Sequence, residues 1–216
     1  MDIKILYNDN DIAVCIKPVG KDAEKDMPAL LQRQLNTPEA FCVHRLDMAV
    51  GGVMVYALNK KAAAELSGQI ARQQIQKEYL AVVQGQPEEQ SATLCDLLYK
   101  DKSRNKSYVV KRKRAGVKEA KLEYRCLESR EDMSLVRILL HTGRSHQIRV
   151  QFSSRKMPLV GDVKYGSQYR DCHISLFSCA LSFKHPKSGK AMHFEYFPES
   201  EHYWKEFEYI KNGGAT

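Results

Sequence analysis

The chain has 216 residues, of which 43% are hydrophobic and 28% charged, so extensive disorder is excluded. No apolar run approaches the roughly 18 residues of a membrane-spanning helix. Lys and Arg number 34 against 26 acidic residues, which gives a net charge of +8. The first residues include acids and lack the apolar stretch of a signal peptide, which predicts a cytoplasmic protein without membrane contact.

Short apolar runs bounded by turn residues predict ten strands, at 3–7, 12–17, 41–46, 53–58, 77–83, 107–110, 118–127, 133–141, 174–183 and 191–197. Cap residues and apolar spacing predict four helices, at 28–36, 60–74, 145–154 and 201–211. The second helix has Asn59 as its N-cap and an apolar stripe formed by Ala63, Leu66 and Ile70.

The order of these elements predicts the fold class. Strands and helices mix without the regular βαβ alternation of a parallel sheet, which favours an α+β fold with a largely antiparallel mixed sheet flanked by helices and loops. The sequence has no internal repeat and no Gly/Ser linker. We therefore expect a single domain over residues 1–216.

Basic residues are concentrated in one segment. Between Lys100 and Arg114, eight basic residues stand against one acid, and the rest of the chain is nearly neutral. Such a run can be a solvated hairpin edge, but its concentration favours contact with a polyanion such as RNA. The run Lys111, Arg112, Lys113 and Arg114 is the candidate for phosphate contacts.

Motifs for several common chemistries are missing. There is no GxGxxG, no GxxxxGK[ST], no HExxH and no GxSxG, so no cofactor is expected. Six cysteines without a CxxC predict free thiols. His141 and His146 lack a Cys or acidic companion nearby, so no metal site is expected either.

Two polar clusters lie in otherwise apolar sequence. The segment His44-Arg45-Leu46-Asp47 follows a short strand, and by itself it fits a turn cap with a surface ion pair. The segment Thr142–Arg149, TGRSHQIR, begins a helix, and its two arginines fit either simple capping or an anion site.

Together these segments resemble the RluA-type family of RNA pseudouridine synthases. The family's nucleophile motif HRLDxxTSG corresponds to HRLDMAVGGVMVYA from His44, and its motif KxYxAxVxG to KEYLAVVQG from Lys77. The third motif corresponds to TGRSHQIR, followed by PLVGDVKYG from Pro158. The opening ILYNDNDIAVCIKPVG resembles the family's first hairpin, so the likeness covers nearly the whole chain.

The resemblance implies a pseudouridine synthase fold with a central RNA-binding cleft, and an isomerase that converts a specific uridine of structured tRNA or rRNA to pseudouridine. The reaction needs no cofactor, and we expect a monomer. By this resemblance Asp47 is the nucleophile, attacking either the ribose carbon or uracil C6, and Arg144 keeps its carboxylate ionised. Tyr79 packs on the base and its hydroxyl can relay the C5 proton.

The remaining roles concern RNA binding. The target base has to be flipped out of folded RNA, and Arg45 resembles the arginine that holds the flipped state. The resemblance also implies that Ile148 forms an apolar floor under the uracil, and Gln147, Arg149 and the segment 100–114 are candidates for backbone contacts.

Two departures from the family pattern leave alternatives open. The family's TSG is Val50-Gly51-Gly52 here, so two hydroxyls near the nucleophile are missing. The catalytic pattern also begins within the first residues, which leaves no room for an upstream RNA-binding module and assigns substrate choice to the catalytic domain. The alternatives are a catalytically silent RNA-binding paralogue and a basic interaction domain.

Overall fold

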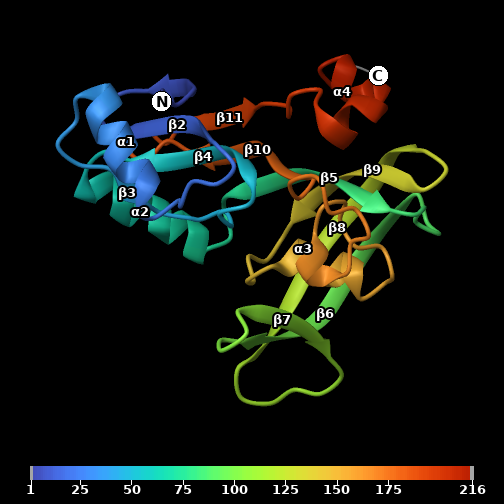
Figure 1. The fold of residues 1–216 in the computed structure, drawn as a ribbon. Coiled ribbons are helices and arrows are strands. Elements are labelled where there is room, and N and C mark those ends of the chain that lie inside the picture. Colours follow the sequence, from blue (N-terminus) through green and yellow to red (C-terminus); the bar gives the residue numbers. More distant parts are fainter. Residues whose placement is uncertain (1, 215–216) are drawn as a thin grey trace. The chain divides into compact units, whose positions relative to one another are not determined.

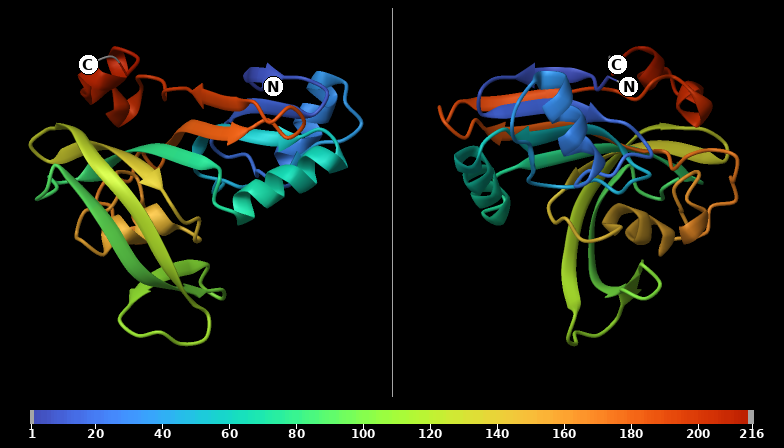
Figure 2. Two further views of the ribbon diagram at one scale, coloured as in Figure 1. Left: turned by 180° about the vertical axis from the view of Figure 1, so that it is seen from behind. Right: turned by 60° about the vertical axis from the view of Figure 1, so that its left-hand side comes forward.

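The computed structural model describes residues 2–214 and divides them into two compact units. Unit 1 contains the residues up to Lys77 together with Phe177–Phe197, and unit 2 contains Glu78–Leu176 and the residues from Pro198 onward. Figures 1 and 2 show the elements of each unit. Whether the two units behave as the single domain expected from the sequence stays a prediction.

Unit 1 is built on a sheet with two helices. Its strands are β1 (Ile5–Asn8), β2 (Ile12–Lys17), β3 (Phe41–Cys42), β4 (Gly51–Ala57), β10 (Leu176–Lys184) and β11 (Ala191–Glu195), and its helices are α1 (Asp26–Leu35) and α2 (Lys60–Ala71). The strand order is β1-β2-β4-β10-β11, with β3 also pairing to β4. The β4–β10 pair is parallel, and the other pairs in this unit are antiparallel.

The core of unit 1 explains why β4 is apolar along its whole length. All seven of its residues are buried. Val53 and Val55 pack with Leu66 of α2 in one cluster, so the sheet and the helix bury each other. The Asn59 side chain accepts a hydrogen bond from the Ala62 N–H at 2.9 Å, which confirms the predicted N-cap.

Unit 2 is built on an antiparallel sheet in the order β5-β9-β8-β6-β7. The strands are β5 (Gln76–Gln84), β6 (Ser91–Asp101), β7 (Lys106–Val110), β8 (Val117–Ser129) and β9 (Met133–Leu140). Its helices are α3 (Gln147–Ser153), η1 (Val163–Tyr165), η2 (His202–Glu206) and α4 (Glu208–Lys211). No helix within the described residues is long and apolar enough to span a membrane.

The structure differs from the sequence prediction in three elements. The β6 strand was not predicted, because only two of its eleven residues, Leu94 and Leu98, are buried and the period of two is lost. The predicted strand 41–46 ends at Cys42. The predicted helix 201–211 is broken at Phe207, which is extended (φ −110°, ψ 125°) and fully buried.

Candidate active site

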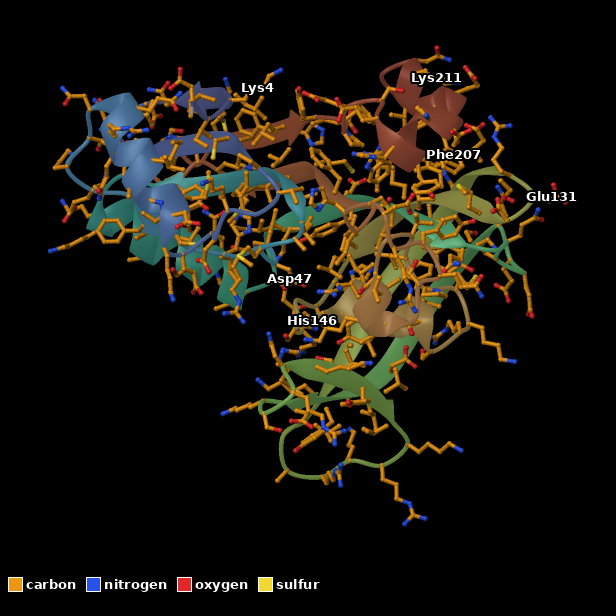
Figure 3. The ribbon with its side chains drawn as sticks, viewed as in Figure 1. Lys4, Asp47, Glu131, His146, Phe207 and Lys211 are labelled. Carbon is orange, nitrogen blue, oxygen red and sulfur yellow. The ribbon has the colours of Figure 1, made fainter. Side chains whose placement is uncertain are left out.

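Asp47 lies in the turn between β3 and β4 (Figure 3). The Asp47 carbonyl accepts a hydrogen bond from the Val50 N–H at 2.9 Å, which closes the turn. Gly52 then has φ +128°, and a Cβ at this position would lie 2.3 Å from the backbone oxygen of Ser178 on β10. Only glycine allows β4 to pass so close to β10, so Gly52 fixes the path of the chain at the start of β4, five residues after Asp47.

The residues before Asp47 point in different directions. Arg45 is exposed, and its Nη1 lies 3.4 Å from Oε2 of Glu24. His44 Nε2 accepts a hydrogen bond from the Val55 N–H at 3.2 Å. Burial, helped by the positive charge of Lys77, lowers the pKa of His44 to about 3, so this imidazole is neutral. His44 therefore anchors the segment to β4, while Arg45 remains available to a ligand.

Lys17 is a residue near Asp47 to which the sequence analysis gave no role. Its side chain is completely buried at the end of β2. Its ammonium group donates to the backbone oxygens of Pro18, Lys21 and Met48 at 2.9, 2.8 and 3.3 Å. A lysine directly after an apolar strand and before Pro-Val-Gly is the signal that could have identified it.

Arg144 lies in the loop between β9 and α3 of unit 2. Its backbone N–H donates to Gln147 Oε1 at 3.0 Å, and its Nε donates to the Glu119 carbonyl at 2.8 Å. Arg144 also lines an open pocket of about 570 Å³ together with Lys113, Arg114 and Lys118. The structure thus brings Arg144 together with two members of the predicted basic run.

Gln147 and Arg149, which the sequence suggests as RNA contacts, both have partners within unit 2. Gln147 is buried and donates to the Lys121 carbonyl at 3.1 Å. Arg149 is buried and forms a bidentate pair with Asp162, at 2.7 and 2.8 Å. These contacts tie α3 to β8 and to the PLVGDVKYG segment, so the two side chains support the Arg144 loop.

Tyr79 and Ile148 are both buried in unit 2, at 6% and 4% exposure. Tyr79 stands on β5 opposite Ile138 of β9. Ile148 lies in α3, one residue after Gln147. Because both side chains are buried, the sheet holds Tyr79 and the helix holds Ile148, and each can present a fixed apolar surface.

The predicted phosphate-contacting run lies in the loop between β7 and β8, and all four residues are exposed. Lys113 Nζ lies 2.5 Å from Glu119 Oε1, and the Arg114 guanidinium lies 4.9 Å from the centre of the Tyr99 ring. Lys111 and Arg112 extend the positive surface of this loop. Their exposure is what contact with a phosphate backbone requires.

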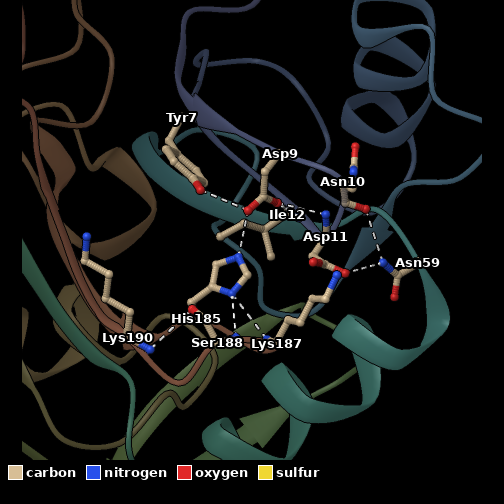
Figure 4. A network of polar contacts seen from close by, with 10 residues as sticks. All are labelled: Tyr7, Asp9, Asn10, Asp11, Ile12, Asn59, His185, Lys187, Ser188 and Lys190. Carbon is tan, nitrogen blue, oxygen red and sulfur yellow. Dashed lines mark hydrogen bonds and ion pairs between the residues drawn. The ribbon is translucent and has the colours of Figure 1, made fainter.

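One group among the described residues has the composition of a metal site: Asp9, Asp11 and His185 (Figure 4). His185 Nε2 and Asp9 Oδ2 are 2.8 Å apart, and His185 Nδ1 accepts from the backbone N–H groups of Lys187 and Ser188. Asp11 accepts from Asn59 at 2.9 Å. Because Asp9 and His185 bond to each other, this pair joins the β1–β2 turn to the β10–β11 hairpin.

The family model described as RNA pseudouridylate synthase matches residues 12–154. This chain belongs to the RNA pseudouridine synthase family. The matched span includes the Asp47 turn, the β5 tyrosine and the Arg144 loop. Members of the family are isomerases that act on RNA, so the predicted family and enzyme class are confirmed.

Curated relatives agree with this assignment. The chain is 34% identical over 203 residues to the dual-specificity RNA pseudouridine synthase RluA of Yersinia pestis, covering 88% of this chain and 97% of that protein. It is 32% identical over 211 residues to an uncharacterized RNA pseudouridine synthase, YlyB, of Bacillus subtilis, covering 90% of this chain and 69% of the relative. It is 30% identical to the ribosomal large subunit pseudouridine synthase C of Buchnera aphidicola, covering 88% of this chain and 65% of that protein.

Solved structures confirm the predicted fold class. Human RNA pseudouridylate synthase domain containing 1 superposes with a TM-score of 0.78 at 23% identity, covering 92% of this chain and 84% of that one. Human RNA pseudouridylate synthase domain containing 4 gives the same TM-score at 21% identity, covering 94% and 90%. At these identities the likeness concerns the fold alone.

Proposed function

We propose that this chain converts a specific uridine in structured tRNA or rRNA to pseudouridine, with Asp47 as the nucleophile. The observation that carries the proposal is the Asp47 turn, which is closed by the Val50 N–H and followed by a glycine that no other residue can replace without a backbone clash. Relatives named for ribosomal RNA and for dual specificity support an RNA of this kind as substrate. We propose a monomer that works in the cytoplasm, where these RNAs are found.

The proposed reaction is an internal rearrangement. Asp47 forms a temporary bond to the ribose carbon or to uracil C6, and the N1–C1′ bond breaks. The uracil turns, C5 bonds to C1′, the Asp47 bond breaks with its electron pair returning to the carboxylate, and the C5 proton is exchanged for a proton on N1. Arg144 favours the ionised carboxylate, and Tyr79 contacts the base and relays the C5 proton.

RNA binding is assigned to side chains that can reach a ligand. Arg45 holds the flipped nucleotide, and the exposed run from Lys111 to Arg114 contacts phosphates. Ile148 supplies an apolar surface for the uracil. Gln147 and Arg149 are left out of this set because they are buried against partners within unit 2.

A second candidate function, a silent RNA-binding protein, is motivated by the missing hydroxyls of the first motif. Val50 is 2% exposed, so its side chain is part of the core. A Cβ at Gly51 would lie 3.3 Å from both the Lys17 carbonyl and a Val19 methyl group, so the neighbouring atoms leave little room for a serine there. The intact Asp47 and Arg144 favour the active enzyme.

The deciding experiment is Asp47→Asn, measured by tritium release from RNA labelled at uridine C5. The amide has nearly the shape of the carboxylate but is not a competent nucleophile, so turnover should be abolished while folding and RNA binding persist. Asp2→Asn, an exposed change in the same unit, is the matched control and should remain active. Turnover of Asp47→Asn close to that of the wild type would refute the nucleophile assignment.

The RNA and the uridine are identified by a separate measurement. Pseudouridines are mapped in total RNA from cells with and without this chain. A site that disappears on deletion and returns with the wild type, but not with Asp47→Asn, is the expected result. If no pseudouridine site disappears on deletion, or if Asp47→Asn restores the lost site, the silent RNA-binding protein is favoured.

A further inference from the structure

Two exposed apolar side chains border the Asp47 turn. In the described part of the chain three large apolar residues are exposed: Val19, Met48 and Val163, at 40%, 60% and 47%. Met48 directly follows Asp47, and Val19 lies in the loop after β2. The Gly20 N–H donates to the Met48 carbonyl at 2.8 Å, so this loop is bonded to the Asp47 turn. Val19 and Met48, here called the apolar pair, are therefore held beside the same turn.

The apolar pair coincides with a departure of this chain from the family pattern. Val50 and Gly51 stand where the pattern has threonine and serine. A Cβ at Gly51 would lie 3.3 Å from a methyl group of Val19, so Val19 lies against the place where the serine side chain would begin. Near Asp47 this chain therefore presents apolar atoms where the family pattern has a hydroxyl-bearing side chain.

Folding does not account for the exposure of the apolar pair. An apolar side chain stabilises the folded chain through the surface that it buries, and more than half of Met48 remains in water. A lone exposed apolar residue such as Val163 is ordinary on a protein surface. Two such residues on bonded loops beside the proposed nucleophile instead form a surface that a bound substrate can cover.

The chemistry of the pair limits which part of an RNA can cover it. Phosphates and ribose hydroxyls bind cations and hydrogen-bonding groups, which a valine lacks and a methionine sulfur supplies only weakly. The face of a base is aromatic, and a methionine sulfur makes favourable contacts with aromatic rings. When a target nucleotide is flipped out of a stack, the bases next to it lose a stacking partner, and their faces become available.

We propose that Val19 and Met48 form a subsite for the face of a base next to the target uridine, and that the subsite favours a purine there. A purine has the larger face and buries more of the apolar pair than a pyrimidine does. The inference rests on the proposed function, in which Asp47 is the nucleophile of an RNA isomerisation. It assigns part of the substrate choice to the loops around that nucleophile.

The test changes the protein and the RNA separately and together. The RNA is a synthetic fragment around the uridine identified by the mapping experiment, with an abasic nucleotide at either neighbouring position. The protein is the wild type or the double variant Val19→Ser with Met48→Gln. The measurement is the single-turnover rate of tritium release at subsaturating protein. At one of the two positions the abasic RNA should react roughly fivefold more slowly than intact RNA with the wild type.

In the double variant the same abasic change should slow the reaction by roughly twofold or less, because the contact is already absent. With intact RNA of each neighbouring base, the wild type should react faster with a purine, and the double variant should lose this preference. Val163→Ser, which removes the exposed apolar residue of η1, is the matched control and should retain the full abasic effect. Met48→Leu keeps an apolar side chain and should also retain it.

Met48→Gln alone changes a residue that is 60% exposed, so it serves if the double variant does not fold, and it should reduce the abasic effect. No abasic effect in the wild type at either position, or an equal effect in the wild type and the variant, would overturn the inference. Asp47→Asn is measured in parallel. If that variant is active, or if no site is mapped, the proposed function fails, whereas an inactive Asp47→Asn with an unchanged abasic effect in the double variant refutes only the subsite.

Discussion

Arg144 and Arg149 belong to the same eight-residue segment but have different surroundings. Arg149 is buried and bonded through two nitrogens to Asp162, whereas Arg144 lines an open pocket and bonds through Nε to a backbone carbonyl. A planar guanidinium suits both environments, the first as an internal clamp and the second as a group that can meet a ligand. The chemical role of Arg144 can therefore be tested separately from its role in folding.

We expect Arg144→Met to lower turnover by at least roughly a hundredfold, about 2.7 kcal/mol in the activation barrier, with a much smaller loss of RNA affinity. If Arg144 serves the nucleophile, its planar fork matters, and Arg144→Lys should recover little of the rate. The rate is measured by tritium release and the affinity by filter binding. Lys118→Met, which changes another cation of the same pocket, is the matched control.

The opposite pattern would give Arg144 another role. A lysine is also a competent phosphate ligand, so turnover near that of the wild type in Arg144→Lys, with only affinity lost in Arg144→Met, would place Arg144 on the RNA backbone. The same result would remove Arg144 from the proposed catalytic set.

At the scale of elements, strands with a buried face were predictable and the exceptions have physical causes. β4 has seven buried residues and was predicted from its apolar run, whereas β6 has only two buried residues among its eleven and was not predicted. The position of Asp47 in a tight turn followed from the motif. The Arg149–Asp162 pair could not be predicted, because residue type does not show that a partner 13 positions away returns to α3.

The loop from Lys111 to Arg114 is the element on which the charge argument depends. Replacing all four residues by serine removes at most four phosphate contacts, so the slope of log affinity against log salt should flatten by up to roughly 3. Lys113 and Arg114 already contact Glu119 and Tyr99, so the observed change can be smaller. Affinity for the RNA is measured over a series of salt concentrations.

A matched variant distinguishes the effect of the Lys111–Arg114 loop from the effect of the net charge of the chain. Serine in place of four exposed lysines of unit 1, Lys60, Lys61, Lys187 and Lys190, removes the same charge elsewhere. We expect this control to leave the slope nearly unchanged. Equal slopes for the two variants would mean that net charge, and not the loop between β7 and β8, attracts the RNA.

At the scale of the whole molecule, the path of the chain bears on whether its two units are independent. The chain crosses from one unit to the other three times: between Lys77 and Glu78, between Leu176 and Phe177, and between Phe197 and Pro198. The first crossing lies within β5 and the second within β10, so neither is a flexible linker. A strand that supplies residues to both units cannot unfold in one of them without disturbing the other.

We therefore expect the chain to unfold in a single cooperative transition, as one domain does. Trp204, the sole tryptophan of the sequence, reports on unit 2 by its fluorescence, and labelling of the fully buried Cys15, resolved from the other five cysteines by peptide mass mapping, reports on unit 1. In a urea titration the two probes should give the same midpoint, and the same slope of unfolding free energy with urea. Lys77→Pro places a proline at the crossing within β5, and it should lower the urea midpoint reported by both probes by the same amount. Two separated midpoints in the wild type would show that the units are distinct domains, and the single-domain prediction would then be wrong.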